Sequence, residues 1–87
     1  MDAIERDIRA FLNDSLPPMH DGEIAADASL FEAGVLDSIG VLGLVTWLER
    51  TFDIRVDDRE IVPENIDGIA RLVAYVRDKR AEAGHAE

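Results

Sequence analysis

Two adjacent residues, Asp37 and Ser38, offer a carboxylate and a hydroxyl directly before a stretch with helical periodicity. The unpaired N–H groups and positive dipole end of a helix start favour a phosphate there. A phosphodiester on Ser38 would therefore sit where the helix stabilises negative charge. Asp and Ser are also common N-cap residues, so a plain helix cap is the simpler interpretation of the dipeptide by itself.

The remaining polar residues predict neither a metal site nor a catalytic centre. His20 and His85 lie far apart, and neither has the spacing to a second ligand that a zinc site needs. Gly40 and Gly43 lack the third glycine, the preceding strand and the lysine of a phosphate-binding loop. The chain has no cysteine, which excludes disulfides and a cysteine nucleophile. We therefore expect a protein without enzymatic activity of its own.

Composition indicates one small acidic domain. The chain has 87 residues, 47% of them hydrophobic, and a formal net charge of −10. This charge disfavours nucleic acid and anionic lipid and favours encounter with basic protein surfaces, although solubility is the plainer interpretation. No apolar run approaches the roughly 20 residues of a membrane span, and Met1–Arg6 lacks the order of a signal peptide. We expect a cytoplasmic monomer.

The first element expected to position the dipeptide is a helix over residues 3–16, which Asp2 caps and Pro17-Pro18 ends. A proline disfavours helical geometry in the residue before it, so the pair marks a firm boundary. The apolar stripe of this helix consists of Ile4, Ile8, Phe11 and Leu12.

A long connection over residues 17–37 then leads to Ser38. Ser29 and Glu32 fit a capping box, in which each side chain satisfies a backbone N–H near the other. Gly34 can close this turn in a left-handed conformation. The side chains expected to hold the loop on the core are Leu30, Phe31 and Leu36.

The strongest helical pattern spans residues 38–52. Ile39 and Leu42 share the side opposite the core with Thr46 and Glu49, so two apolar side chains near the helix start are expected to face water. The core side consists of Val41, Leu44, Val45, Leu48 and Phe52.

Residues 53–56 predict a loop that buries Ile54 and Val56, because a single short strand without a partner is unstable. Residues 58–61 are expected to form a short helical turn that ends by Pro63.

Asp67 is expected to cap a last helix that runs to about Ala81, with residues 83–87 as a frayed tail after a domain over 1–82. The fold class is therefore all-α, with three main helices, one short helix and a long loop between the first and second helices. The buried stripe of the last helix consists of Ile69, Leu72, Val73 and Val76.

Within this architecture, residues 30–39 resemble the attachment motif of acyl and peptidyl carrier proteins. In that family a Leu-Phe pair, a glycine and then Asp-Ser-Leu or Asp-Ser-Ile precede the second helix. Residues 52–56 and 63–66 resemble the third-helix region, particularly of the D-alanyl and aminoacyl carrier branch. Further residues that match the pattern are Leu44, Leu48, Glu49 and Phe52.

The resemblance implies a four-helix carrier bundle whose Ser38 accepts 4′-phosphopantetheine from coenzyme A. A separate phosphopantetheinyl transferase would run this reaction, with Asp37 helping to hold its magnesium ion and substrate. The terminal thiol of the arm would carry acyl or aminoacyl thioesters, which explains how a chain without cysteine can do thiol chemistry. The implied partners are this transferase, an adenylating ligase that loads the acyl or aminoacyl group, and downstream biosynthetic enzymes.

The sequence departs from the family pattern at Gly40 and Gly43, where acidic residues are frequent. We expect Trp47 to lie over Gly43 and to border a flat groove with Ile39 and Leu42; alternatively, Trp47 caps the core. The departures favour a dedicated ligase for an amino acid or a specialised acid. The predicted partner surface consists of Ile39, Leu42, Gly43, Thr46, Trp47, Asp58 and Glu60, although the acidic residues taken singly also fit a plain solvated face.

Two other functions remain open at this point. One is an acyl carrier protein of fatty-acid synthesis, and the other is an acidic protein-interaction module without a cofactor, in which Ser38 is only a helix cap.

Overall fold

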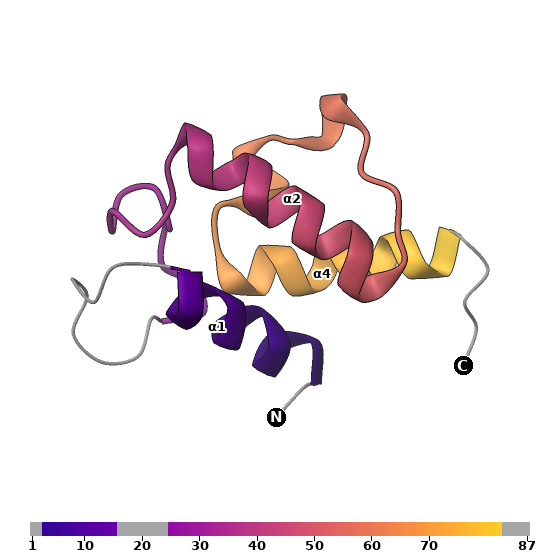
Figure 1. Ribbon diagram of the computed structural model, residues 1–87, viewed down its shortest axis with the longest axis horizontal. Coiled ribbons are helices and arrows are strands. Elements are labelled where there is room, and N and C mark those ends of the chain that lie inside the picture. Colours follow the sequence, from indigo (N-terminus) through magenta and orange to yellow (C-terminus); the bar gives the residue numbers. More distant parts are fainter. Residues whose placement is uncertain (1–2, 16–24, 83–87) are drawn as a thin grey trace.

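Apolar side chains at helical spacing produce three long helices in the computed structural model, α1 (Ala3–Ser15), α2 (Ser38–Phe52) and α4 (Ile69–Glu82) (Figure 1). The 3-10 helix η1 (Asp58–Glu60) and the one-turn helix α3 (Pro63–Ile66) lie between α2 and α4. The structure describes residues 3–15 and 25–82, and these ranges contain no strand. The all-α prediction is therefore confirmed for the described part of the chain.

The core lies between the long helices, and α4 packs against α1, α2 and α3. The predicted core faces of α2 and α4 are confirmed, with Val45 and Val73 only half-buried at their margins. The sequence did not identify Tyr75 as a core residue, but its ring is buried. The fully buried side chains are Ile8, Leu12, Leu30, Leu44, Leu48, Ile69, Leu72 and Val76.

The loop that leads to α2 is held by buried residues, but Phe31 is not one of them. Leu30 and Leu36 are buried as predicted, whereas the prediction for Phe31 is wrong because its side chain is 38% exposed. Neighbouring side chains of a turn point in different directions, so the residue that fills the core at Leu30 leaves the next one outside. Gly34 takes a φ of +76°, the left-handed conformation expected of it.

Asp67 does not cap α4, which corrects another prediction. Its backbone N–H donates to the carbonyl of Pro63, so Asp67 ends α3 instead. Its side chain faces the loop before α2. Helix α4 begins two residues later, at Ile69.

The segment between α2 and α4 forms the predicted loop and turn, plus a short helix over residues 63–66, where the sequence resembles the third-helix region of carrier proteins but shows no helical periodicity. Ile54 is buried and Val56 half-buried, as expected. The 3-10 helix η1 confirms the predicted turn, and Asp57 and Glu60 close it with a capping box. Helix α3 was not recognised from periodicity, and it has proline at its first position, where a missing N–H costs nothing.

Within residues 3–15 and 25–82, no helix has the length and apolar character to cross a bilayer. Several predictions concern residues outside these described ranges. The residues concerned are Asp2, Leu16, Pro17, Pro18, His20 and 83–87.

Candidate functional site

The start of α2 separates the roles of Asp37 and Ser38. Asp37 is the N-cap: its backbone is extended, and its Oδ1 accepts a hydrogen bond from the N–H of Gly40 at 2.7 Å. Its carbonyl accepts from the N–H of Val41 at 2.9 Å. Ser38 is the first helical residue and is exposed. The hydroxyl of Ser38 is therefore not used as the helix cap.

Gly40 gives the Asp37 cap room to form. A Cβ atom at this position would lie 3.1 Å from Asp37 Oδ1 and 3.4 Å from Leu36 Cδ1. The first distance is tighter than ordinary van der Waals contact, so a side chain would push the cap or Leu36 aside. This close approach compensates for the low helix propensity of glycine.

The backbone before Ser38 is fixed by a compact turn. The carbonyl of Leu30 accepts hydrogen bonds from the N–H groups of both Val35 and Leu36, at 2.9 and 3.1 Å. The side chains of Leu30, Val35 and Leu36 are all buried. An exposed serine thus follows directly from a firmly packed segment.

The carboxylate of Asp67, which is 36 to 38 residues away in the sequence, binds this turn. Ser29 Oγ donates to Asp67 Oδ2 at 2.6 Å, and the N–H of Phe31 donates to Oδ1 at 2.9 Å. Partial burial acts to raise the pKa of Asp67, but the bonds from Ser29, Phe31 and Leu30 outweigh it and lower the pKa. Only one half of the predicted capping box is present among the described residues, the bond from the Glu32 N–H to Ser29 Oγ at 3.1 Å.

The predicted partner residues on α2 lie on its outer face. Ile39 is 81% exposed and Leu42 is 66% exposed, as the sequence predicted. Thr46 is exposed one turn further and donates from Oγ1 to the carbonyl of Leu42 at 3.0 Å. Gly43 is exposed too, and a Cβ atom there would meet nothing within 4 Å.

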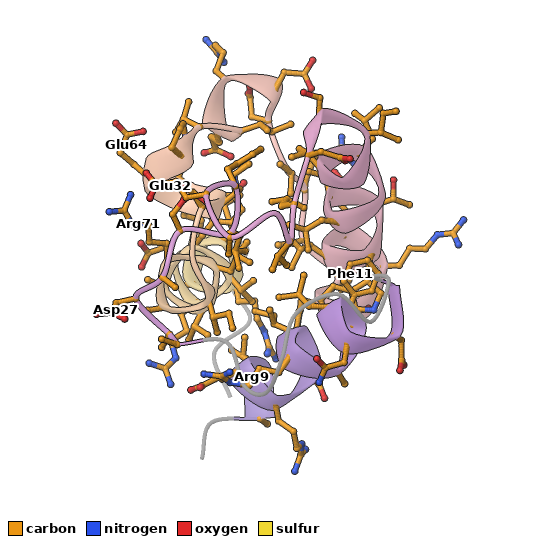
Figure 2. All side chains as sticks on the ribbon, turned by 90° about the vertical axis from the view of Figure 1, so that its left-hand side faces the viewer. Arg9, Phe11, Asp27, Glu32, Glu64 and Arg71 are labelled. Atoms are coloured by element: carbon orange, nitrogen blue, oxygen red, sulfur yellow. The ribbon has the colours of Figure 1, made fainter. Side chains whose placement is uncertain are left out.

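Trp47 does not lie over Gly43, so the predicted groove is wrong. Its ring stacks on Phe11 of α1, with centroids 4.6 Å apart and planes at 20°. It also meets the edge of Phe52 at 5.4 Å. Phe11 points from α1 toward α2 in Figure 2. Trp47 therefore caps the core between α1 and α2, which was the alternative interpretation.

Asp58 and Glu60 occupy different settings within η1. Asp58 is exposed, whereas Glu60 is half-buried. Glu60 Oε1 accepts from Lys79 Nζ at 3.0 Å and from the Tyr75 hydroxyl at 2.8 Å. These bonds, led by the one from Lys79, lower the pKa of Glu60. Glu60 thus anchors η1 on α4, a contact that sequence patterns gave no means of finding.

Residues 8–76 match the family described as "Phosphopantetheine attachment site". The chain belongs to this family. It is similar to the D-alanyl carrier protein of Streptococcus pyogenes serotype M5 (strain Manfredo), with 37% identity over 60 residues that cover 69% of this chain and 76% of the relative. The same values hold for the D-alanyl carrier protein of serotype M49 (strain NZ131).

A solved structure supports the fold of this carrier. One chain of a structure described as "Crystal structure of FAD-dependent dehydrogenase" matches with a TM-score of 0.69 and 25% identity. The match covers 79% of this carrier and 97% of that chain.

The protein is thus a carrier that bears 4′-phosphopantetheine covalently. The start of α2 fits this group, because an exposed hydroxyl lies at a helix end that favours a phosphodiester. The described ranges hold no cluster of His, Cys, Asp or Glu that fits a metal ion.

Proposed function

We propose that the carrier bears its arm on Ser38 and delivers aminoacyl or specialised acyl thioesters between enzymes. The observation that supports this most is the exposed hydroxyl of Ser38 on the first turn of α2, beside a cap formed by Asp37. Because Asp37 satisfies the helix end, the Ser38 hydroxyl is available for modification without loss of the cap.

In this proposal Ser38 and Asp37 have different roles when the transferase attaches the arm. Ser38 Oγ loses its proton to the transferase and forms the new bond to phosphorus, while the bond to the nucleotide part of coenzyme A breaks. Asp37 Oδ1 accepts from the Gly40 N–H, which leaves Oδ2 as the oxygen that would help to hold the transferase's magnesium ion. The bound arm then supplies the thiol that this cysteine-free chain lacks.

The surface beside Ser38 is the proposed contact for partner enzymes. On α2 it consists of Ile39, Leu42, Gly43 and Thr46, and Asp58 and Glu60 of η1 are proposed as a second, acidic contact. Between residues 10 and 49 the sequence has seven Asp or Glu and no Lys or Arg. Such a stretch favours basic partner surfaces and fast, reversible encounters.

The similar D-alanyl carrier proteins favour an adenylating ligase for an amino acid as the loading enzyme, over an enzyme of fatty-acid synthesis. Glycines in place of acidic residues early in α2 support the same choice. Attachment of the arm requires coenzyme A, and thioester formation by the ligase requires ATP. Both requirements support a cytoplasmic location.

Intact mass spectrometry tests the attachment. After incubation with coenzyme A and a phosphopantetheinyl transferase, the wild-type mass should increase by one phosphopantetheinyl group, and Ser38→Ala should not change. No increase in the wild-type protein, or an increase that persists in Ser38→Ala, would overturn the proposal. The mass of the protein isolated from its own cells should further show an aminoacyl or specialised acyl group on the arm, and a long fatty chain would refute the proposed cargo.

A further inference from the structure

The turn between α3 and α4 is joined to the loop before Ser38 by several independent contacts. The Asp67 carboxylate takes the Ser29 hydroxyl and the Phe31 N–H, as described above. The N–H of Ala70 also donates to the carbonyl of Ala26 at 3.0 Å. A Cβ atom on Gly68 would lie 3.4 Å from the carbonyl oxygen of Ala28, at ordinary van der Waals distance, so the two segments lie close together there.

Asp67 does the work that a local capping residue does in most turns. The first N–H groups of residues 29–34 need acceptors, and Glu32 was expected to accept from the N–H of Ser29. Glu32 is exposed, and the structure gives the turn a different acceptor: Asp67 accepts from the Ser29 hydroxyl across a sequence separation of 38 residues, and from the N–H of Phe31. Hydrogen bonds to an ionised carboxylate are stronger than those between neutral groups, so this long-range cap is well suited to fix the turn.

A short chain of contacts leads from this cap to Ser38. Asp67 holds the backbone at Phe31, next to Leu30. The carbonyl of Leu30 holds the N–H groups of Val35 and Leu36. Leu36 is followed directly by the Asp37 cap and by Ser38. The position of the serine thus depends on a turn whose first residues are held by Asp67.

We propose that Asp67 is a positioning residue for the modification of Ser38, and this inference rests on the proposed attachment there. The carboxylate keeps the turn in the arrangement that the transferase binds. Without it, only a fraction of the molecules present Ser38 correctly at any time. The apparent affinity of a binding partner decreases by that fraction, so the KM for the carrier should rise while kcat stays close to the wild-type value.

Asp67→Asn tests this role, and Glu5→Gln is its matched control. Glu5 accepts from Arg9 Nε at 2.9 Å on α1, so Glu5→Gln makes the same chemical change and the same change in net charge. Loading by the transferase is followed by intact mass over a range of carrier concentrations, well below the melting temperature. We expect Asp67→Asn to raise the KM about tenfold with kcat nearly unchanged, because charged hydrogen bonds to the turn are lost. Glu5→Gln should keep the wild-type KM.

Ser29→Ala loses one of the two bonds to Asp67, together with the bond that Ser29 Oγ accepts from the Glu32 N–H, and it covers the case in which Asp67→Asn does not fold. Its KM should rise less, and adding it to Asp67→Asn should raise the KM little further, because both changes remove the same contact. The inference is overturned if Asp67→Asn and Ser29→Ala keep the wild-type KM, or if Glu5→Gln raises the KM as much. Continued loading of Ser38→Ala would instead refute the attachment itself, so the two failures are distinguishable.

Discussion

Asp37 and Ser38 divide two tasks that either side chain could perform. The structure gives the capping task to Asp37, through its bond to the Gly40 N–H, and leaves Ser38 exposed. A change at Asp37 can therefore affect the helix, the loading reaction or both. Variants that differ in charge but keep the cap separate these effects.

We predict that Asp37→Asn keeps the stability of the fold, whereas Asp37→Ala lowers it by about 1 kcal/mol, because Asn caps a helix as well as Asp and Ala does not. Both variants should be loaded more slowly by the transferase, because both remove the carboxylate proposed to reach its magnesium ion. Urea denaturation gives the stability, and intact mass over time gives the loading rate. If Asp37→Asn were modified by the transferase at the wild-type rate, the role of Asp37 would be limited to capping the helix.

The position of Asp37-Ser38 at the start of a helix could be predicted from the sequence, but the contacts that hold the preceding loop could not. Its place before a strong helical pattern, inside a motif with a glycine and two large apolar residues, is what made Ser38 the predicted attachment residue. The contact from Asp67 to Ser29 joins residues 38 positions apart, and a single sequence carries no signal for such a pair. The local capping pattern at Ser29 and Glu32 concerns backbone N–H groups and gave no sign of the bond from the Ser29 hydroxyl to Asp67.

The two glycines of α2 have different surroundings. Gly40 allows the Asp37 cap to close, whereas Gly43 faces open space. Glycine in an exposed helix interior is destabilising relative to alanine, because it loses more backbone freedom on folding. Only the second position leaves that cost without a visible compensation.

We therefore predict that Gly43→Ala raises the free energy of unfolding by roughly 0.5–1 kcal/mol. Gly40→Ala should gain less, or lose stability, because its Cβ atom would lie 3.1 Å from Asp37 Oδ1. Thermal unfolding followed by circular dichroism compares the two variants with the wild-type protein. An equal gain at both positions would show that the cap does not need the space at Gly40.

The three long helices follow from apolar periodicity, which a stretch of 13 to 15 residues makes clear. Helix α3 has only four residues, which is too few for a periodic pattern. Its proline also suggested the end of a helical turn, although Pro63 is the first residue of α3. Trp47 was misplaced for a different reason. The direction in which its ring leans depends on Phe11, a residue of another helix.

Three carboxylates of the described residues join the segments between the long helices to other parts of the fold. Glu49 Oε2 accepts from the Val56 N–H at 2.9 Å, Glu60 accepts from Tyr75 and Lys79, and Asp67 holds the loop before α2. Part of the strong negative charge of the chain is therefore structural. Protonation of Glu60 or Asp67 should weaken the links that these two carboxylates make.

We predict a loss of stability below about pH 4.5 that Glu60→Gln reduces. The folded pKa of Glu60 lies below its ordinary value of 4.5, so its contribution is complete above that value and disappears as the pH falls through the folded pKa. Asp57 and Asp67, with an ordinary value of 3.8, act in the same direction. As the pH falls, the negative net charge of the chain decreases, and the weaker repulsion between carboxylates opposes this loss of stability. The quantity to compare is therefore the difference in stability between the wild-type protein and Glu60→Gln.

Urea midpoints at pH 7, 5, 4 and 3 give that difference. Glu60→Gln should be less stable than the wild-type protein at pH 7 and should approach it as the pH falls. A constant difference at every pH would show that the Glu60 charge does not stabilise the fold.

The stack of Trp47 on Phe11 provides an internal optical probe. Trp47 is the only tryptophan of the chain, and its ring lies between a side chain of α1 and one of α2. Indole emission responds to solvent and to neighbouring groups, so a separation of the two helices would change the fluorescence of the unlabelled protein. Each engagement with a partner enzyme can therefore be followed for its effect on the contact between α1 and α2.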